Sequence, residues 1–245
     1  QKYNIASDML KPGQTTYELG LLDSDRDLIP FEEDVVTQGT GFAKNLNVSH
    51  GINKYITGFG SLSDIPIETG GQQFATLGLK FSLYNAIGSI ETYRSSDGGS
   101  AYDVKVARDF LGANLNFRAA VLSDFESPQV GFGDSAEVFR VDASASRSFR
   151  LPVGNLGLSL RYEYELSKND RALSTYDFRQ SFSYQGLRLN HGLKSTFSEK
   201  SHLRTDGSVS AAYRFNRNWD MRGVASYEIF PDLSTQSISS ELRYR

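Results

Sequence analysis

Two glutamates, Glu163 and Glu165, are the residues whose type and spacing come nearest to a catalytic pair. Side chains two positions apart on a strand share one face, and two carboxylates on one face can act as general acid and general base. The same spacing is more typical of a water-facing wall in which arginines balance the carboxylates, and Arg161 falls on that face as well. The sequence therefore favours a charged wall over an acid–base pair.

The side chains that usually build metal centres and nucleophilic sites are scarce. The chain has no cysteine, which excludes disulfides, thiolate metal ligands and cysteine nucleophiles. Its three histidines, His50, His191 and His202, show neither HExxH nor His-x-His spacing. No phosphate-binding loop, dinucleotide-binding glycine motif or nucleophilic serine with a partnered histidine is present. We therefore expect no enzyme activity, no metal site and no cofactor.

Overall charge and hydropathy narrow the class of protein further. With 26 Lys and Arg against 29 Asp and Glu, the net charge of −3 gives no reason to expect a nucleic-acid partner. No run of about 18 apolar residues is present, so we expect no transmembrane helix. A mean hydropathy of −0.40 is still compatible with a membrane protein whose apolar and polar residues alternate. Residues 1–10 lack the apolar run of a signal peptide, so we expect an exported protein to be represented here by a mature or excised portion.

The two glutamates lie in a stretch, residues 156–167, whose residue types alternate strictly. Its sequence, LGLSLRYEYELS, places leucine or tyrosine at every even position and glycine, serine, arginine or glutamate at every odd one. A period of two predicts a strand with one apolar and one polar face. The length suits a membrane-crossing strand of roughly 9–11 residues better than an average strand of about 5–6.

The same alternation recurs along the chain. The segments that we expect to form strands are residues 15–22, 35–52, 55–61, 75–83, 86–93, 102–110, 115–121, 139–149, 156–167, 176–184, 187–197, 208–215, 219–229 and 238–244. Short turns are expected at residues 53–54, 84–85, 152–155 and 217–218, and longer loops at residues 23–34, 65–72, 95–100 and 123–135. The sequence predicts an all-β, antiparallel up-and-down meander of about fourteen strands, within roughly 12 to 16, as a single domain over residues 1–245.

Two architectures fit such a meander. A transmembrane β-barrel turns its apolar faces to lipid and its polar faces to a wet lumen, whereas a soluble sandwich or solenoid packs its apolar faces into a core. The barrel is favoured because the polar faces are too hydrophilic for a packed interior and the apolar faces too continuous for water. Aromatic residues at strand ends fit the interfacial girdles of a barrel, namely Phe149, Tyr176, Tyr184, Phe215 and Trp219.

Charged residues on the polar faces form the candidate site. Those that we expect to face the lumen are Arg140, Asp142, Arg161, Glu163, Glu165, Asp177, Arg179, Arg188, Arg214 and Arg222. Opposite charges on neighbouring strands attract, so we expect these arginines to form a ladder with the carboxylates. Residues 123–135 contain too few apolar side chains to fold inward as a plug, and the lumen is therefore expected to be open or filled by another protein.

Four segments resemble the barrel of the outer-membrane usher of the chaperone–usher pathway. Residues 10–20, LKPGQTTYELG, are similar to the strand with Arg-Pro-Gly, Tyr and Gly that follows the usher's plug domain. The hairpin from SHGI to YITGFG, residues 49–60, resembles the usher's Tyr-Gly-Leu and Thr-x-x-Gly-Gly hairpin. Residues 86–90, AIGSI, and 112–115, GANL, resemble two further usher segments. The likeness covers roughly residues 9–151, and no plug or flanking domain of an usher is seen.

The resemblance implies a barrel in the bacterial outer membrane that passes or docks secreted protein subunits. Its implied partners are the lipid bilayer, secreted subunits and other outer-membrane or periplasmic proteins. The alternative from the charged lumen alone is a passive or polymer-conducting porin. An enzyme housed in a barrel, such as a lipase or protease, is the weakest class because the triad is missing. Whether the chain closes alone or belongs to a larger barrel stays open at this point.

Overall fold

The computed structural model describes residues 9–23, 42–67, 70–125, 137–169, 171–199 and 201–244. All regular secondary structure within these ranges is β-strand, and no helix in them could cross a membrane. Three predicted features lie wholly or largely outside the described residues. They are the loop at 23–34, the first part of the strand predicted at 35–52, and most of the loop at 123–135.

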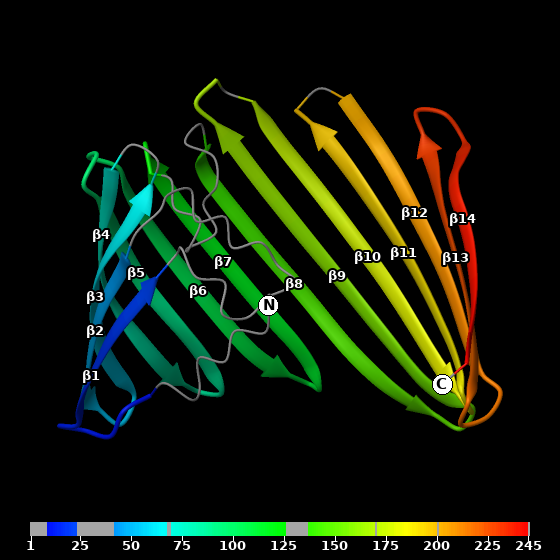
Figure 1. The fold of residues 1–245 in the computed structure, drawn as a ribbon, viewed down its shortest axis with the longest axis horizontal. Coiled ribbons are helices and arrows are strands. Elements are labelled where there is room, and N and C mark those ends of the chain that lie inside the picture. The colour runs from blue at the N-terminus through cyan, green and yellow to red at the C-terminus, as the bar shows by residue number, and fades with distance from the viewer. Residues whose placement is uncertain are drawn as a thin grey trace. The chain divides into compact units, whose positions relative to one another are not determined.

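Fourteen strands follow one another in one sheet, and each strand lies beside the next one in the sequence (Figure 1). They are β1 (Thr15–Asp23), β2 (Phe42–Asn53), β3 (Ile56–Ile67), β4 (Gly70–Leu83), β5 (Ala86–Ser95), β6 (Ser100–Phe110), β7 (Ala113–Ser123), β8 (Glu137–Leu151), β9 (Gly154–Ser167), β10 (Ala172–Tyr184), β11 (Leu187–Ser198), β12 (Ser201–Arg214), β13 (Trp219–Phe230) and β14 (Ser234–Tyr244). The predicted all-β, antiparallel up-and-down meander of about fourteen strands is confirmed.

Short connections join the strands at one end, which we call the turn end, and the opposite end is the loop end. The turn-end connections are residues 54–55, 84–85, 111–112, 152–153, 185–186 and 215–218. At 84–85 both residues have positive φ, 49° for Tyr84 and 62° for Asn85, which is the tight hairpin turn whose twist matches that of the strands. The predicted turn at 84–85 is confirmed, whereas the first hairpin turns one residue later than predicted because Asn53 still pairs with Ile56.

The loop predicted at residues 65–72 is wrong, because most of it is strand. Strand β3 continues to Ile67 and β4 begins at Gly70, with Ile65 opposite Gln72 and Pro66 opposite Gly71. The Gly-Gly pair suggested a break, since glycine weakens isolated strands. Pairing with the neighbouring strand overrides that local preference.

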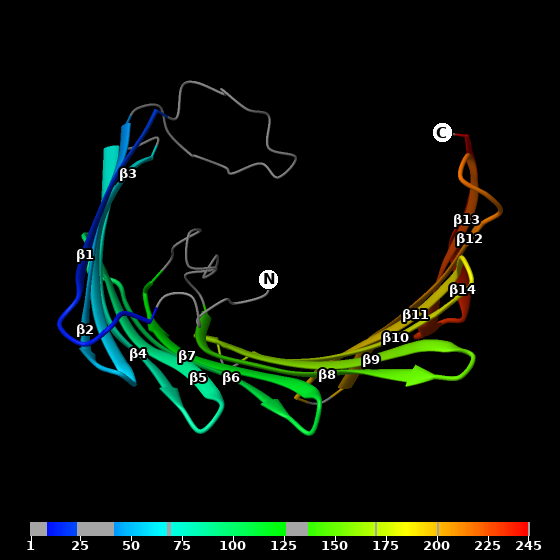
Figure 2. The same ribbon diagram turned by 90° about the horizontal axis from the view of Figure 1, so that it is seen from below.

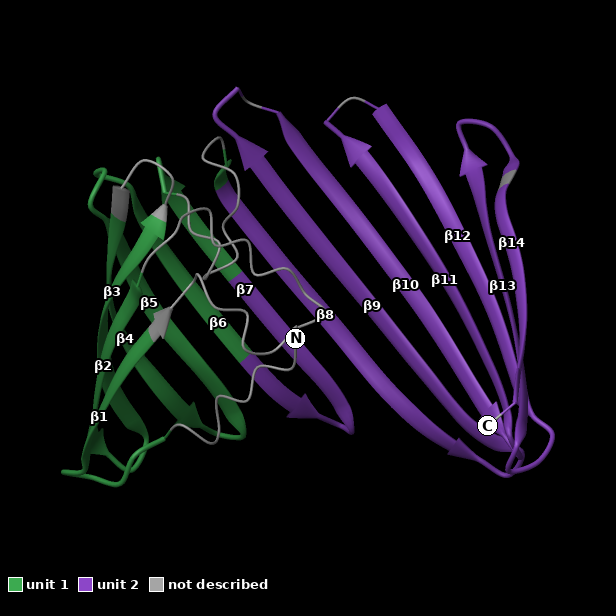
Figure 3. Cartoon of the chain, in the orientation of Figure 1, with its two compact units in different colours: residues 1–106, 119–138 green, residues 107–118, 139–245 purple. Residues whose placement is uncertain are grey.

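The chain divides into two compact units (Figure 3). Unit 1 comprises residues 1–106 and 119–138, and unit 2 comprises residues 107–118 and 139–245. Seen from below, strands β9 to β13 of unit 2 form one curved layer (Figure 2). A sandwich needs a second sheet packed on the first, so the described part of this unit is not a sandwich.

Large apolar residues are exposed on one face of each unit, and in unit 1 a charged residue is buried on the other face. On the apolar face of unit 1, the side chain of Leu19 is 73% exposed and that of Leu77 is 65% exposed, whereas Asp103 on the polar face is fully buried. In unit 2, Leu160 is 51% and Ile238 77% exposed. Soluble monomers rarely leave apolar patches larger than a few hundred Å² in water. The exposed apolar faces are therefore unusual for a soluble monomer.

The buried apolar residues of unit 1 lie on its polar face, near the loop end. The cluster comprises Phe74, Tyr93, Ala101, Ala120, Leu122 and Phe125. Phe125 lies just beyond the end of β7, in the loop expected to be polar, yet it is fully buried. Its ring centroid is 6.0 Å from that of Phe74 and 5.8 Å from that of Tyr93. The described start of this loop therefore turns onto the polar face.

A tyrosine covers a strand glycine on the apolar face of unit 2. Tyr227 lies directly opposite Gly207, and a Cβ added to Gly207 would overlap the tyrosine ring. The ring cannot swing away freely, because the Tyr227 hydroxyl lies 2.9 Å from Nε2 of His191 and is hydrogen-bonded to it. Gly223, on the same face, has no such neighbour, since the nearest atom to its added Cβ is the Ser239 carbonyl oxygen at 4.0 Å.

The Gly207→Ala variant is therefore expected to lose about 1–3 kcal/mol of unfolding free energy, because overpacking forces the ring from its place. The matched Gly223→Ala variant should change it by no more than about 0.5 kcal/mol. Denaturant unfolding of both variants measures the difference. Equal effects of the two substitutions would contradict the covering role of Tyr227.

A charged face as the candidate functional site

Strand pairing in unit 2 places the predicted charges on one face. Arg161 on β9 is opposite Asp177 on β10, which is opposite Lys194 on β11. Lys194 is opposite Asp206 on β12, and Asp206 is opposite Glu228 on β13. A row of charges, alternating in sign up to Asp206, therefore crosses five strands, with apolar side chains on the other face.

Five of the predicted site residues form one group near the loop end, which we call the loop-end cluster. Its members are Arg140, Asp142, Arg161, Glu163 and Glu165. Nε of Arg140 lies 3.0 Å from Oδ2 of Asp142, and its Nη1 lies 3.7 Å from Oε1 of Glu165. Nη2 of Arg161 lies 3.3 Å from Oδ1 of Asp142 and forms a second ion pair with Glu163. Each glutamate of the suggested acid–base pair thus has an arginine partner, which is the arrangement of a salt-bridged wall.

Three further ion pairs continue this pattern. Nη2 of Arg179 lies 2.6 Å from Oδ2 of Asp177 on the same strand. Arg204 contacts Asp206 at 2.8 Å and Glu228 at 3.4 Å. The sequence interpretation missed Arg204 because the strand predicted at 208–215 began too late, and it missed Glu228 although this residue lies within the strand predicted at 219–229. The signal was present, since Arg204, Asp206 and Ser208 continue the alternation of β12.

Small polar residues separate the loop-end charges from those at the turn end. Gly157 is opposite Ser181, Ser181 is opposite Asn190, and Asn190 is opposite Ser210. Nδ2 of Asn190 donates a hydrogen bond of 3.0 Å to Oγ of Ser210. This zone carries hydrogen-bonding groups without charge.

The remaining predicted residues, Arg188, Arg214 and Arg222, lie beyond this zone at the turn end. The structure therefore divides the ten candidates into two groups. All three arginine side chains are exposed, and in the described part of the chain none of them forms an ion pair. Arg188 and Arg222 both lie opposite Ala212, one on each side of β12.

The apolar face of unit 2 carries an aromatic row near the loop end. Consecutive ring contacts join Tyr162 to Tyr176 at 5.0 Å, Tyr176 to Phe197 at 5.8 Å, Phe197 to His202 at 4.5 Å and His202 to Phe230 at 4.1 Å between centroids. His202 therefore stacks between two phenylalanines, and its Nε2 lies 2.7 Å from the Thr205 hydroxyl. An aromatic row at a strand end is typical of a membrane–water interface.

A second group of aromatics lies at the turn end of the same face. Trp219 contacts Tyr244 at 5.0 Å and Tyr213 contacts Phe215 at 4.9 Å between ring centroids. Trp219 and Phe230 are the first and last residues of β13, which has 12 residues. At about 3.3 Å per residue and a tilt of roughly 45°, the two groups are about 26 Å apart in height. This separation agrees with the apolar band of about 25 Å of outer-membrane barrels.

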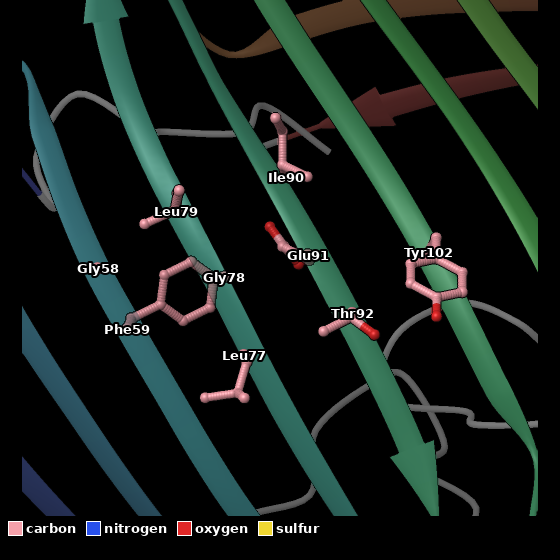
Figure 4. A pocket seen from close by; sticks show the side chains of 9 residues that line it. All are labelled: Gly58, Phe59, Leu77, Gly78, Leu79, Ile90, Glu91, Thr92 and Tyr102. Atoms are coloured by element: carbon pink, nitrogen blue, oxygen red, sulfur yellow. The ribbon is translucent and has the colours of Figure 1, made fainter.

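Unit 1 has a shallow hollow of about 490 Å³ over β3 to β6 (Figure 4). Most of its lining is apolar and includes Leu77, Leu79 and Ile90. The carboxylate at its edge, Glu91, is paired with Lys105 at 3.1 Å on the polar face. The hollow is therefore suited to contact with apolar groups and provides no reactive side chain.

A buried ion network holds β5 and β6 together on the polar face of unit 1. Nζ of Lys105 lies 3.1 Å from Oε2 of Glu91 and 3.1 Å from Oδ2 of Asp103. Tyr93 and Ser89 donate hydroxyl hydrogen bonds to Glu91. The described residues contain no group of three or more His, Asp or Glu side chains that could hold a metal ion.

Two comparisons with known proteins were negative. No protein-family model matches the chain, and no curated protein matches it significantly.

Proposed function

We propose that the chain is a transmembrane β-barrel of the bacterial outer membrane, which forms a translocation pore or scaffold for secreted protein of the usher type. The observation that carries the membrane part of this proposal is the difference between the two faces. Leucines and tyrosines are exposed on one face, and ion pairs line the other. Lipid on the first face and water on the second satisfy both.

The size of the charged face supports a pore rather than a filled barrel. Small barrels of about eight strands are filled by their own side chains, whereas a closed ring of fourteen leaves room for water or a guest. On the polar face of unit 2, serine, glycine and asparagine lie between the charged rows, and their short side chains leave this face unobstructed. These residues can hydrogen-bond to water or to a passing polar chain.

Contact between two usher-like segments supports the usher class. The LKPG segment precedes β1, and the HGI segment lies near the end of β2. The amide of Gly13 donates to the carbonyl of Gly51 at 2.7 Å, and the amide of Gly51 donates to the carbonyl of Gln14 at 2.8 Å. The Leu10 amide donates to the buried hydroxyl of Thr57 at 3.0 Å. Two of the four segments on which the resemblance rests thus form one local structure.

The alternative function is a passive or polymer-conducting porin, and the charged wall favours it. Rings of lumen charge set which ions a pore admits. The two functions differ in their partners, because only the first requires secreted subunits and their chaperone. Genes for a periplasmic chaperone and pilus subunits beside this gene would support the usher class, and sugar or ion uptake genes would support the porin class.

Conductance tests the pore directly. The purified chain, inserted into a planar bilayer, is expected to conduct ions. Changing Arg161, Arg179 and Arg188 together to Glu should shift the reversal potential toward cation selectivity, because six units of charge change on the lumen face. A chain that inserts without conductance, alone and with chaperone–subunit complexes added, would contradict the pore.

A further inference from the structure

The turn end of the polar face in unit 2 has an excess of positive charge. Its rows contain four arginines, Arg188, Arg214, Arg222 and Arg243, and two carboxylates, Asp220 and Glu241. Four positive and two negative charges leave a local charge of about +2. Glu241 is engaged by Arg243 at 3.1 Å, although Arg222 lies opposite it in the register. The chain as a whole has a net charge of −3, so this excess is local.

Three of these arginines surround a small residue. Arg188 on β11 and Arg222 on β13 lie on either side of Ala212 on β12. Neighbouring strands are about 4.8 Å apart, so the backbones at Arg188 and Arg222 are roughly 10 Å apart. Arg214 lies two residues further along β12, on the same face and about 7 Å from Ala212. Because the side chain of Ala212 is only a methyl group, it leaves space between the three long cationic side chains.

The loop-end cluster differs from these turn-end arginines, because it contains a carboxylate shared by two arginines. There, Asp142 lies between Arg140 and Arg161 and supplies the anion that both guanidinium groups contact. At the turn end Ala212, which lies opposite both Arg188 and Arg222 and two residues from Arg214, has no carboxylate to offer them. Asp220 lies opposite Arg214 and two residues from Arg222, but no carboxylate lies between Arg188 and Arg222, whose like charges repel one another.

We infer that Arg188, Arg214 and Arg222 form a binding site for a phosphate-type oxyanion above Ala212. Planar guanidinium groups bind phosphate oxygens through paired hydrogen bonds, which an ammonium group cannot match. The site goes beyond the proposed function, because it would bind its ligand whether or not the barrel conducts. Its place on the polar face separates it from lipid head groups.

Calorimetric titration of the detergent-solubilised chain with inorganic pyrophosphate tests the site. The wild type is expected to bind at low ionic strength, and binding should weaken in high salt because the charges are exposed. Each of Arg188→Gln, Arg214→Gln and Arg222→Gln should weaken binding about tenfold, since each removes charge-assisted hydrogen bonds. The control Arg179→Gln removes an arginine already paired with Asp177 and should bind like the wild type.

A second variant keeps all three arginines. Ala212→Asp would place a carboxylate where Asp142 lies in the loop-end cluster, and it should abolish pyrophosphate binding. Retained sheet in circular dichroism would show that the variants fold. Wild-type protein that does not bind, a triple Gln variant that binds as tightly as the wild type, or binding that requires added phospholipid would each overturn the site. None of these results depends on conductance, so the pore proposal stands or falls separately.

Discussion

Replacing Lys105 with methionine is expected to lower the free energy of unfolding by about 3–5 kcal/mol. The Lys105 ammonium lies 3.1 Å from each of two carboxylates, and the side chains of all three residues are largely buried, with Asp103 fully so. Methionine fills a similar volume but leaves Glu91 and Asp103 as two buried like charges. Urea unfolding of the vesicle-inserted chain measures the loss.

The matched control is Lys44→Met. Lys44 pairs with Asp64 at 3.7 Å, but its side chain is 60% exposed. Exposed pairs contribute about 0–1 kcal/mol, so this variant should unfold almost like the wild type. If Lys105→Met also lowered the free energy of unfolding by less than about 1 kcal/mol, the ion network would be hydrated. That result would contradict its burial on the polar face of unit 1.

Arginine at two consecutive positions of β12 is expected to give opposite results. Val209 lies on the apolar face and is 43% exposed, whereas Ser210 lies on the polar face among Asn190 and other uncharged side chains. If the apolar face contacts lipid near mid-membrane, Val209→Arg should cost about 2–4 kcal/mol. Ser210→Arg should cost no more than about 1 kcal/mol, because its side chain reaches water.

Folding into vesicles of phospholipid, followed by denaturant titration, measures both free energies. The two variants share strand, depth and introduced residue, so that only the face differs. Equal losses would contradict a lipid-facing side, and a larger loss for Ser210→Arg would assign the lipid to the other face.

The strands were predictable because a period of two is a local signal. Residues 156–167 were expected as a strand, and β9 (Gly154–Ser167) differs only by two residues at its start. The error at residues 65–72 has a different origin. Gly70 and Gly71 favour a turn by themselves, and only their partners on β3 hold them extended.

The grouping of the charged residues could not be predicted from alternation. The pattern shows which face a residue occupies but not its register with the next strand. Register decides that Asp142 contacts Arg161 on the next strand and that Ala212 lies between Arg188 and Arg222. The burial of Phe125 against Phe74 and Tyr93 could not be predicted either, because these residues are distant in the sequence.

A cysteine scan of β9 tests most directly whether the apolar face contacts lipid. The chain contains no cysteine, so each single substitution from Leu156 to Leu166 gives one reactive thiol. In phospholipid vesicles, thiols at the odd positions, such as Arg161 and Glu163, should react with a water-soluble maleimide. Thiols at even positions, such as Leu160, should resist it, and fluorophores attached there should be quenched by a lipid-phase quencher. Uniform labelling along the strand, or labelling of Leu160 with protection of Glu163, would contradict the membrane orientation.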